Sequence, residues 1–288
     1  MTAGNFEFVV LAALLVLLAL VVRATWMGRR RWNTTEWARG MDLELTPRNE
    51  TLVRSYIART RAFRLAGALL GFFAPMIYQA YVGSPPPVPV DFTLFDALIG
   101  YLVGAVLAEL TIKRPKTDVP SASLTPRELG DYLPARFTAG FRLAATFALV
   151  LVPFLRLLPT RDNLVNLSDI PPEIVLVPTI VLIALGVELL QRYIVVRPQP
   201  AVESDLVQAD DAVRSASVHA LAGAGIALEL LIVSVQLVNL AVVSDVQLLR
   251  WTLPWLGLIC FGVAIGSWVH LTKPFHRGEW HAHEGTRA

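Results

Sequence analysis

The most regular feature of this 288-residue sequence is a series of long apolar runs separated by polar, arginine-rich segments. The hydrocarbon core of a bilayer is about 30 Å thick, so about 20 mostly apolar helical residues cross it. A helix also satisfies its own backbone hydrogen bonds in that medium. Seven runs fit, at about residues 6–26, 65–82, 92–112, 141–158, 174–196, 218–243 and 251–271. The pattern predicts an all-α integral membrane protein, a seven-helix transmembrane bundle that forms one polytopic domain over residues 1–288.

The first run is the shortest, because its unbroken apolar part covers only residues 8–22. A cleaved signal peptide has an apolar region of similar length, but positive residues precede that region. Here Glu7 precedes the run and the arginines follow it. We therefore expect a membrane span, which Arg23 completes by extending its side chain to the interface.

The basic residues predict the orientation of the bundle. Of 25 lysines and arginines, 22 fall in alternate segments: the linker at 27–63 with the flanking Arg23 and Arg64, the segments 113–142 and 192–214, and the tail at 272–288. The other three are Arg156, Arg161 and Arg250. Basic loops remain cytoplasmic, and tryptophans favour the interfaces, as at Trp251 and Trp255. We expect the N-terminus outside and the C-terminus in the cytoplasm.

Parts of the sequence repeat after about 78 residues. The segment 63–66 (FRLA) returns at 141–144, the segment 45–48 (LTPR) returns at 124–127, and Pro75 matches Pro153. A weaker third copy starts at His219, and Glu109 matches Glu188. Coincidence among Leu- and Ala-rich helices explains the apolar matches but not the prolines or LTPR. We predict two or three helical-hairpin repeats followed by a final helix.

The cytoplasmic linkers carry signals for helix starts. Thr125, Pro126 and Glu128 fit a capping box with proline at the first helical position, and Thr46 with Pro47 offers a similar start. Two interpretations stay open for the first linker: a short helix on the inner leaflet, or a solvated helix. The residues expected to contact anionic lipid or a partner protein are Arg29, Arg30, Arg31, Arg54 and Arg61.

Composition supports the membrane assignment and indicates which membrane is involved. Hydrophobic residues make up 55% of the chain, charged residues 17%, and the mean hydropathy is +0.55. A soluble enzyme is excluded on these values, since soluble domains are about a quarter charged. The excess of arginine over lysine indicates a high-GC bacterial genome, hence the plasma membrane of a bacterium. The net charge of +2 indicates no nucleic-acid partner.

One ionisable residue lies deep within a predicted span. Glu229 is about eleven residues into the sixth run, and Gln236 follows on the same helical face. Asn239 lies about 80° around the helix from Glu229. This polar strip could bind a cation, relay a proton or contact a substrate. Alternatively, a protonated Glu229 bonds a neighbouring helix and holds the bundle together.

The remaining polar and small residues in the spans predict structural roles. Glu109 and Glu188 lie near cytoplasmic ends, beside basic residues, so we expect interfacial ion pairs. Three close-packing motifs, Gly-xxx-Gly, begin at Gly67, Gly100 and Gly262.

The sequence offers little for enzymatic chemistry. It has no HExxH, GxSxG, P-loop or dinucleotide-binding motif. The single cysteine, Cys260, permits no intramolecular disulfide, and the tail residues His281 and His283 lack a fixed geometry for a metal. We predict no enzyme activity, no cofactor and no metal site. We expect a non-catalytic accessory or partner subunit of a membrane complex, with a small secondary transporter using Glu229 as the alternative.

Overall fold

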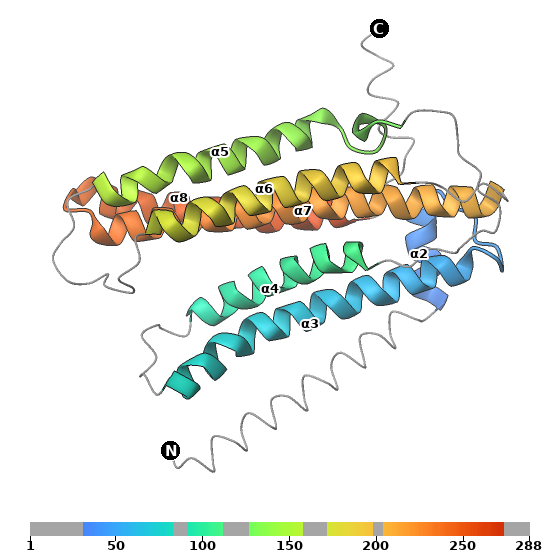
Figure 1. Cartoon of the computed structure of the whole chain (residues 1–288), viewed down its shortest axis with the longest axis horizontal. Coiled ribbons are helices and arrows are strands. Elements are labelled where there is room, and N and C mark those ends of the chain that lie inside the picture. Colours follow the sequence, from blue (N-terminus) through green and yellow to red (C-terminus); the bar gives the residue numbers. More distant parts are fainter. Residues whose placement is uncertain (1–30, 83–90, 112–126, 158–171, 198–203, 274–288) are drawn as a thin grey trace, which may run out of the picture. The chain divides into compact units, whose positions relative to one another are not determined.

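The computed structural model describes residues 31–82, 91–111, 127–157, 172–197 and 204–273 (Figure 1). All the regular elements in these ranges are helices, in agreement with the predicted all-α class. They are α2 (Arg31–Gly40), α3 (Glu50–Val82), α4 (Asp91–Leu110), the short 3₁₀ helix η1 (Leu129–Asp131), α5 (Ala135–Leu157), α6 (Pro172–Val196), α7 (Ser204–Val243) and α8 (Gln247–Thr272).

Four of these helices, α5 to α8, are long and apolar enough to cross a membrane. They coincide with the fourth to seventh predicted spans, and each ends within one residue of the predicted C-terminal boundary. The predicted spans 65–82 and 92–112 correspond to α3 and α4, which are not among the four. The predicted span 6–26 lies outside the described residues.

The chain divides into two compact units, and α7 runs from one into the other at residues 213 and 214. The first unit contains α2, α3 and α4, and its main feature is the pairing of two glycine motifs. An ideal Cβ on Gly67 would overlap the carbonyl oxygen of Gly100, and a Cβ on Gly100 would overlap that of Gly67. In the same way, a Cβ on Gly71 would overlap the carbonyl oxygen of Asp96, and a Cβ on Gly104 would overlap that of Phe63. The predicted close-packing role of these two motifs is confirmed, because each motif packs against the other.

In the second unit, α7 is the central helix and α5, α6 and α8 surround it. In the most apolar stretch of each helix, 78% of α7 is buried. The same share is 28% in α5 and 11% in both α6 and α8. One side of α7 contributes Val233, Leu237 and Leu240 to a core shared with Ala148 of α5 and Ile180 of α6. The outer helices therefore bury one side against α7 and leave apolar residues on the other, as helices in contact with lipid do.

The first linker differs from its predicted form. Helix α3 runs without a break from residue 50 to residue 82, so the linker helix and the predicted span are one helix of 33 residues. A straight helix of that length is about 50 Å long. The linker helix is therefore not the separate short helix that both interpretations expected.

The helix start predicted at Thr46 is confirmed, and it includes Asn49, which the sequence pattern did not indicate. The Thr46 hydroxyl accepts a hydrogen bond from the Asn49 backbone N–H at 3.2 Å, and Asn49 Oδ1 accepts one from the Thr46 N–H at 2.9 Å. These reciprocal bonds make a capping box in which asparagine replaces glutamate. Thr125 and Pro126, where a similar start is expected, lie outside the described residues. Residues 127 and 128 are not helical, and Glu128 caps η1.

Candidate functional site

Glu229 lies on the side of α7 that faces α5 and α6. One turn before it, Gly225 lies against Phe141 of α5 and Val187 of α6, and one turn after it Val233 enters the core shared with those helices. Residues four apart lie on the same helix face, so the carboxyl group is directed between α5 and α6. Its side chain has no exposed surface, and neither carboxyl oxygen has a hydrogen-bond partner.

The other polar side chains of this part of α7 link helices together. The Ser234 hydroxyl donates to the carbonyl oxygen of Gly257 in α8 at 2.8 Å. The Gln236 amide donates to the carbonyl oxygen of Ala148 in α5 at 3.1 Å. Asn239, the third residue of the predicted polar strip, is exposed. The structure therefore keeps Glu229 and Gln236 on the buried side of α7 and separates Asn239 from them.

More buried polar residues occupy α7 than the apolar run contained, because the helix begins fourteen residues before the predicted span. Those before the predicted span are Asp210, Arg214, Ser215 and Ser217, and those within it are His219, Glu229, Ser234 and Gln236. Arg214 has no exposed surface, and its NH1 donates to the carbonyl oxygens of Ile194, Val195 and Arg197 at 2.6–2.9 Å. The charge pattern of the sequence predicts Arg214 only as a basic residue of a loop. The absence of Gly and Pro between residues 204 and 222 was the available signal for the longer helix.

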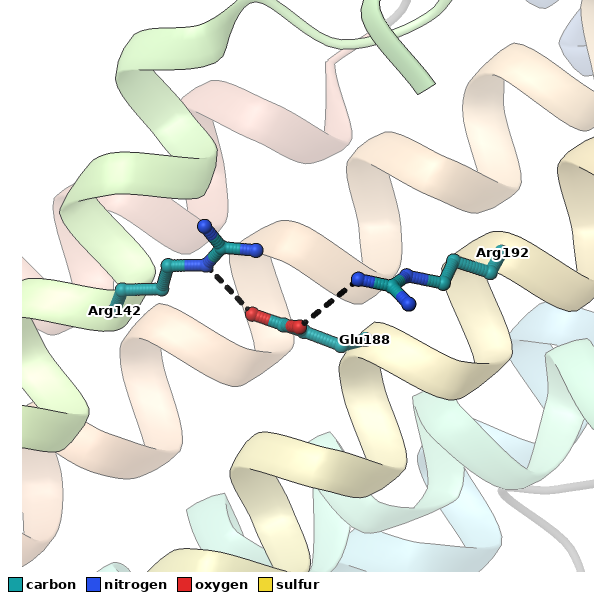
Figure 2. Close-up of polar contacts among 3 residues, drawn as sticks. All are labelled: Arg142, Glu188 and Arg192. Atoms are coloured by element: carbon teal, nitrogen blue, oxygen red, sulfur yellow. Dashed lines mark hydrogen bonds and ion pairs between the residues drawn. The ribbon is translucent and has the colours of Figure 1, made fainter. Parts of the chain in front are cut away.

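Glu188 forms an ion pair, as the sequence predicts, with one partner more than expected (Figure 2). Its Oε1 lies 2.7 Å from Nε of Arg142 in α5, and its Oε2 lies 3.8 Å from a terminal nitrogen of Arg192, one turn further along α6. The Arg192 pair confirms the prediction. The Arg142 pair joins residues 46 positions apart, so helical spacing gave no signal for it.

Glu109 is buried in the first unit, where Oε1 accepts a hydrogen bond of 3.4 Å from the Tyr56 hydroxyl. The basic residues expected beside it, Lys113 and Arg114, lie outside the described residues. The ring of Tyr56 in turn lies 5.7 Å from that of Trp37 in α2. Glu109 therefore contributes a polar contact between α3 and α4 close to where α4 ends.

The arginines expected to contact lipid or a partner are only partly described. Arg29 and Arg30 lie outside the described residues, and Arg31 begins α2. Arg54 pairs with Glu50 one turn earlier at 2.8 Å, while Arg61 is exposed. Among the described residues, Arg54 and Arg61 share no hydrogen bond or ion pair.

Within the described ranges, no group of three His, Cys, Asp or Glu side chains could hold a metal ion. The histidine-containing tail after residue 273 lies outside those ranges. Cys260 is a free thiol, partly buried beside the core of the second unit.

Comparison with known proteins finds no matching family, no similar curated protein and no similar solved structure. The function of this chain therefore has to be argued from its own residues.

Proposed function

We propose that this chain is a multi-pass protein of a bacterial plasma membrane, without enzymatic activity, in which Glu229 binds a proton or a small cation as part of transport. The observation that carries this proposal is the unpaired carboxyl group of Glu229 on the most buried helix of the second unit. The sequence alone favoured an accessory subunit, and the geometry of Glu229 favours the transporter alternative.

The contrast with neighbouring residues supports a functional role. A polar group buried without a hydrogen bond costs about 1–3 kcal/mol, and ionisable groups at membrane depth are rare outside ion and proton pathways. If Glu229 served to hold helices together, its carboxyl group would donate to a neighbouring helix. Ser234 and Gln236 make such bonds instead, to α8 and α5.

We also propose the seven-span topology, with the N-terminus outside and the basic segments in the cytoplasm. In the second unit the basic ends of three helices lie together: Arg142 of α5 and Arg192 of α6 share Glu188, and Phe137 near the start of α5 contacts His270 near the end of α8, with ring centroids 6.2 Å apart. The exposed rings of Trp251 and Trp255, at the other end of α8, suit the opposite interface.

The proposed repeat agrees with the polar contacts of two helix pairs. Glu109 near the end of α4 accepts a hydrogen bond from a side chain of α3, and Glu188 of α6 accepts one from a side chain of α5. These glutamates are 79 residues apart. A glutamate bonded to the preceding helix is therefore found twice, at positions that the repeat matches.

Reconstitution of the full-length protein tests the transport function. Vesicles that contain a trapped pH indicator and carry an imposed membrane potential should show proton movement with the wild-type protein. Glu229→Gln keeps the size of the side chain but cannot exchange a proton, so movement should fall to the level of empty vesicles. Glu173→Gln makes the same change in the first turn of α6 and should transport normally. Equal rates for Glu229→Gln and wild type would contradict the proposal. So would a wild-type protein that moves neither protons nor, with a trapped cation indicator, sodium or potassium ions.

A stability measurement accompanies the transport assay. Glu229→Met replaces the carboxyl group by an apolar side chain of similar length. We expect it to raise the free energy of unfolding in detergent by about 1–3 kcal/mol, because a buried unpaired polar group is removed. A loss of stability would instead indicate that Glu229 holds the bundle together.

A second function, as a partner subunit of a membrane complex, is favoured by the third glycine motif. A Cβ on Gly262 or Gly266 of α8 would meet no atom within 4 Å. The motifs of α3 and α4, in contrast, pack against each other through backbone atoms. Small residues allow close approach of another helix. If that helix belongs to a partner protein, Gly262→Leu should abolish its co-purification in mild detergent without changing the stability of the isolated chain. If stability falls, a helix of this chain covers the motif.

A further inference from the structure

The contact between α5 and α6 carries more positive than negative charge. Two arginines, Arg142 and Arg192, lie on either side of a single carboxylate, Glu188 (Figure 2). The arginine side chains are 60% and 67% exposed, while that of Glu188 is 26% exposed. The group therefore has one unneutralised positive charge, and its arginines are the accessible members.

The hydrogen-bonding capacity of the arginines also exceeds what Glu188 uses. A guanidinium group has five N–H donors. Arg142 contacts the carboxylate through Nε, and Arg192 contacts it through one terminal nitrogen at 3.8 Å, which is longer than a hydrogen bond. Glu188 therefore fixes the position of Arg142 and leaves most donors of both arginines for another acceptor.

The group lies where the helices leave the apolar core. Arg142 is seven residues after the start of α5, and Arg192 is four residues before the end of α6. At 1.5 Å per residue these positions lie about 10 Å and about 6 Å from the helix ends. In helices that cross a membrane, exposed side chains at this depth meet lipid headgroups, and arginine extends toward them.

We propose that Arg142 and Arg192 bind the phosphate group of an anionic lipid, with Glu188 as the residue that positions Arg142. The planar fork of a guanidinium matches two oxygens of a phosphate, and the single surplus charge matches that of a phosphodiester. The site depends on α5 and α6 crossing the membrane but not on proton or cation binding at Glu229. A negative result here would leave the transport proposal unaffected, and the reverse is also true.

Lipid binding to the full-length protein can be measured in mild detergent by native mass spectrometry, with phosphatidylglycerol as the anionic probe and phosphatidylcholine as the zwitterionic one. We expect the wild type to bind phosphatidylglycerol more tightly. Arg142→Ala and Arg192→Ala should each weaken that binding about fivefold, the effect of one basic residue near an anionic surface. Arg250→Ala removes the same charge from an exposed position at the other end of the second unit and should bind like the wild type.

The outcomes separate the possible ligands. Equal affinity of the wild type for the two lipids, or equal effects of Arg142→Ala and Arg250→Ala, would overturn the proposal. Displacement of phosphatidylglycerol by inorganic phosphate at an equal concentration would show that the group binds a soluble phosphate instead of a lipid. Should Arg142→Ala fail to fold, Arg192→Ala remains decisive, because Arg192 is the more exposed arginine and the more distant from Glu188.

Discussion

Replacement of Gly100 by leucine should prevent α3 from packing against α4. A Cβ at this position would overlap the carbonyl oxygen of Gly67 and would lie 3.0 Å from the Cα of Gly71. Both obstacles are backbone atoms, so no side chain can rotate away, and the helices have to separate. Overpacking of a close contact costs about 1–3 kcal/mol when neighbours can yield and more when they cannot. We expect the thermal unfolding temperature of the purified protein to fall by roughly 10 °C.

Gly186→Leu is the matched control for this experiment. It introduces the same side chain into α6, where a Cβ would meet no atom within 4 Å. Leucine is also the better helix former, so the unfolding temperature should be unchanged or slightly higher. The close approach of α3 and α4 would be refuted if both variants had the same unfolding temperature. Size-exclusion chromatography before melting would show whether Gly100→Leu still forms a monodisperse particle.

The sequence predicted where helices end better than where they begin. The ends of α3, α5, α6, α7 and α8 fall within one residue of the predicted span ends. In contrast, α3 and α7 begin 15 and 14 residues before the predicted span starts. Hydropathy measures the apolar part of a helix, whereas the helix itself continues until a residue interrupts its backbone. Polar residues such as Gln208 and Arg214 continue α7 without interrupting it. Hydropathy therefore located the spans and underestimated the helices.

The candidate site shows a similar division between local and long-range information. Residue spacing along α7 placed Glu229 and Gln236 on one face, and both are buried. Asn239, the third residue of the predicted polar strip, is not buried. It lies about 80° around the helix from Glu229, on a side of α7 that is exposed. Which helix covers a given face depends on packing between segments far apart in the chain. The bond from Gln236 to Ala148 and the pair of Arg142 with Glu188 are of this kind, and no local pattern predicted them.

Replacement of Arg214 by alanine should have a large effect on stability. The last carbonyl groups of a helix have no partner within the helix, and water cannot replace such partners where the groups are buried. Arg214 donates to the carbonyl oxygens of Ile194 and Val195, at the end of α6, and to that of Arg197 beyond it. Its positive charge also lies at the negative end of the α6 dipole.

Removal of the Arg214 side chain leaves the buried carbonyl groups of Ile194 and Val195 without this donor, and it leaves a cavity where the side chain was. Hydrogen bonds to a charged group contribute about 1.5–3 kcal/mol each, so we expect a loss of about 3–5 kcal/mol, measured as thermal unfolding in detergent. Arg214→Lys keeps the charge but not the guanidinium fork and should recover only part of the loss. Arg250→Ala, at an exposed position, should unfold like the wild type. If Arg214→Ala did the same, Arg214 would not join α6 to α7, and the burial of a charged residue at that junction would require a functional explanation.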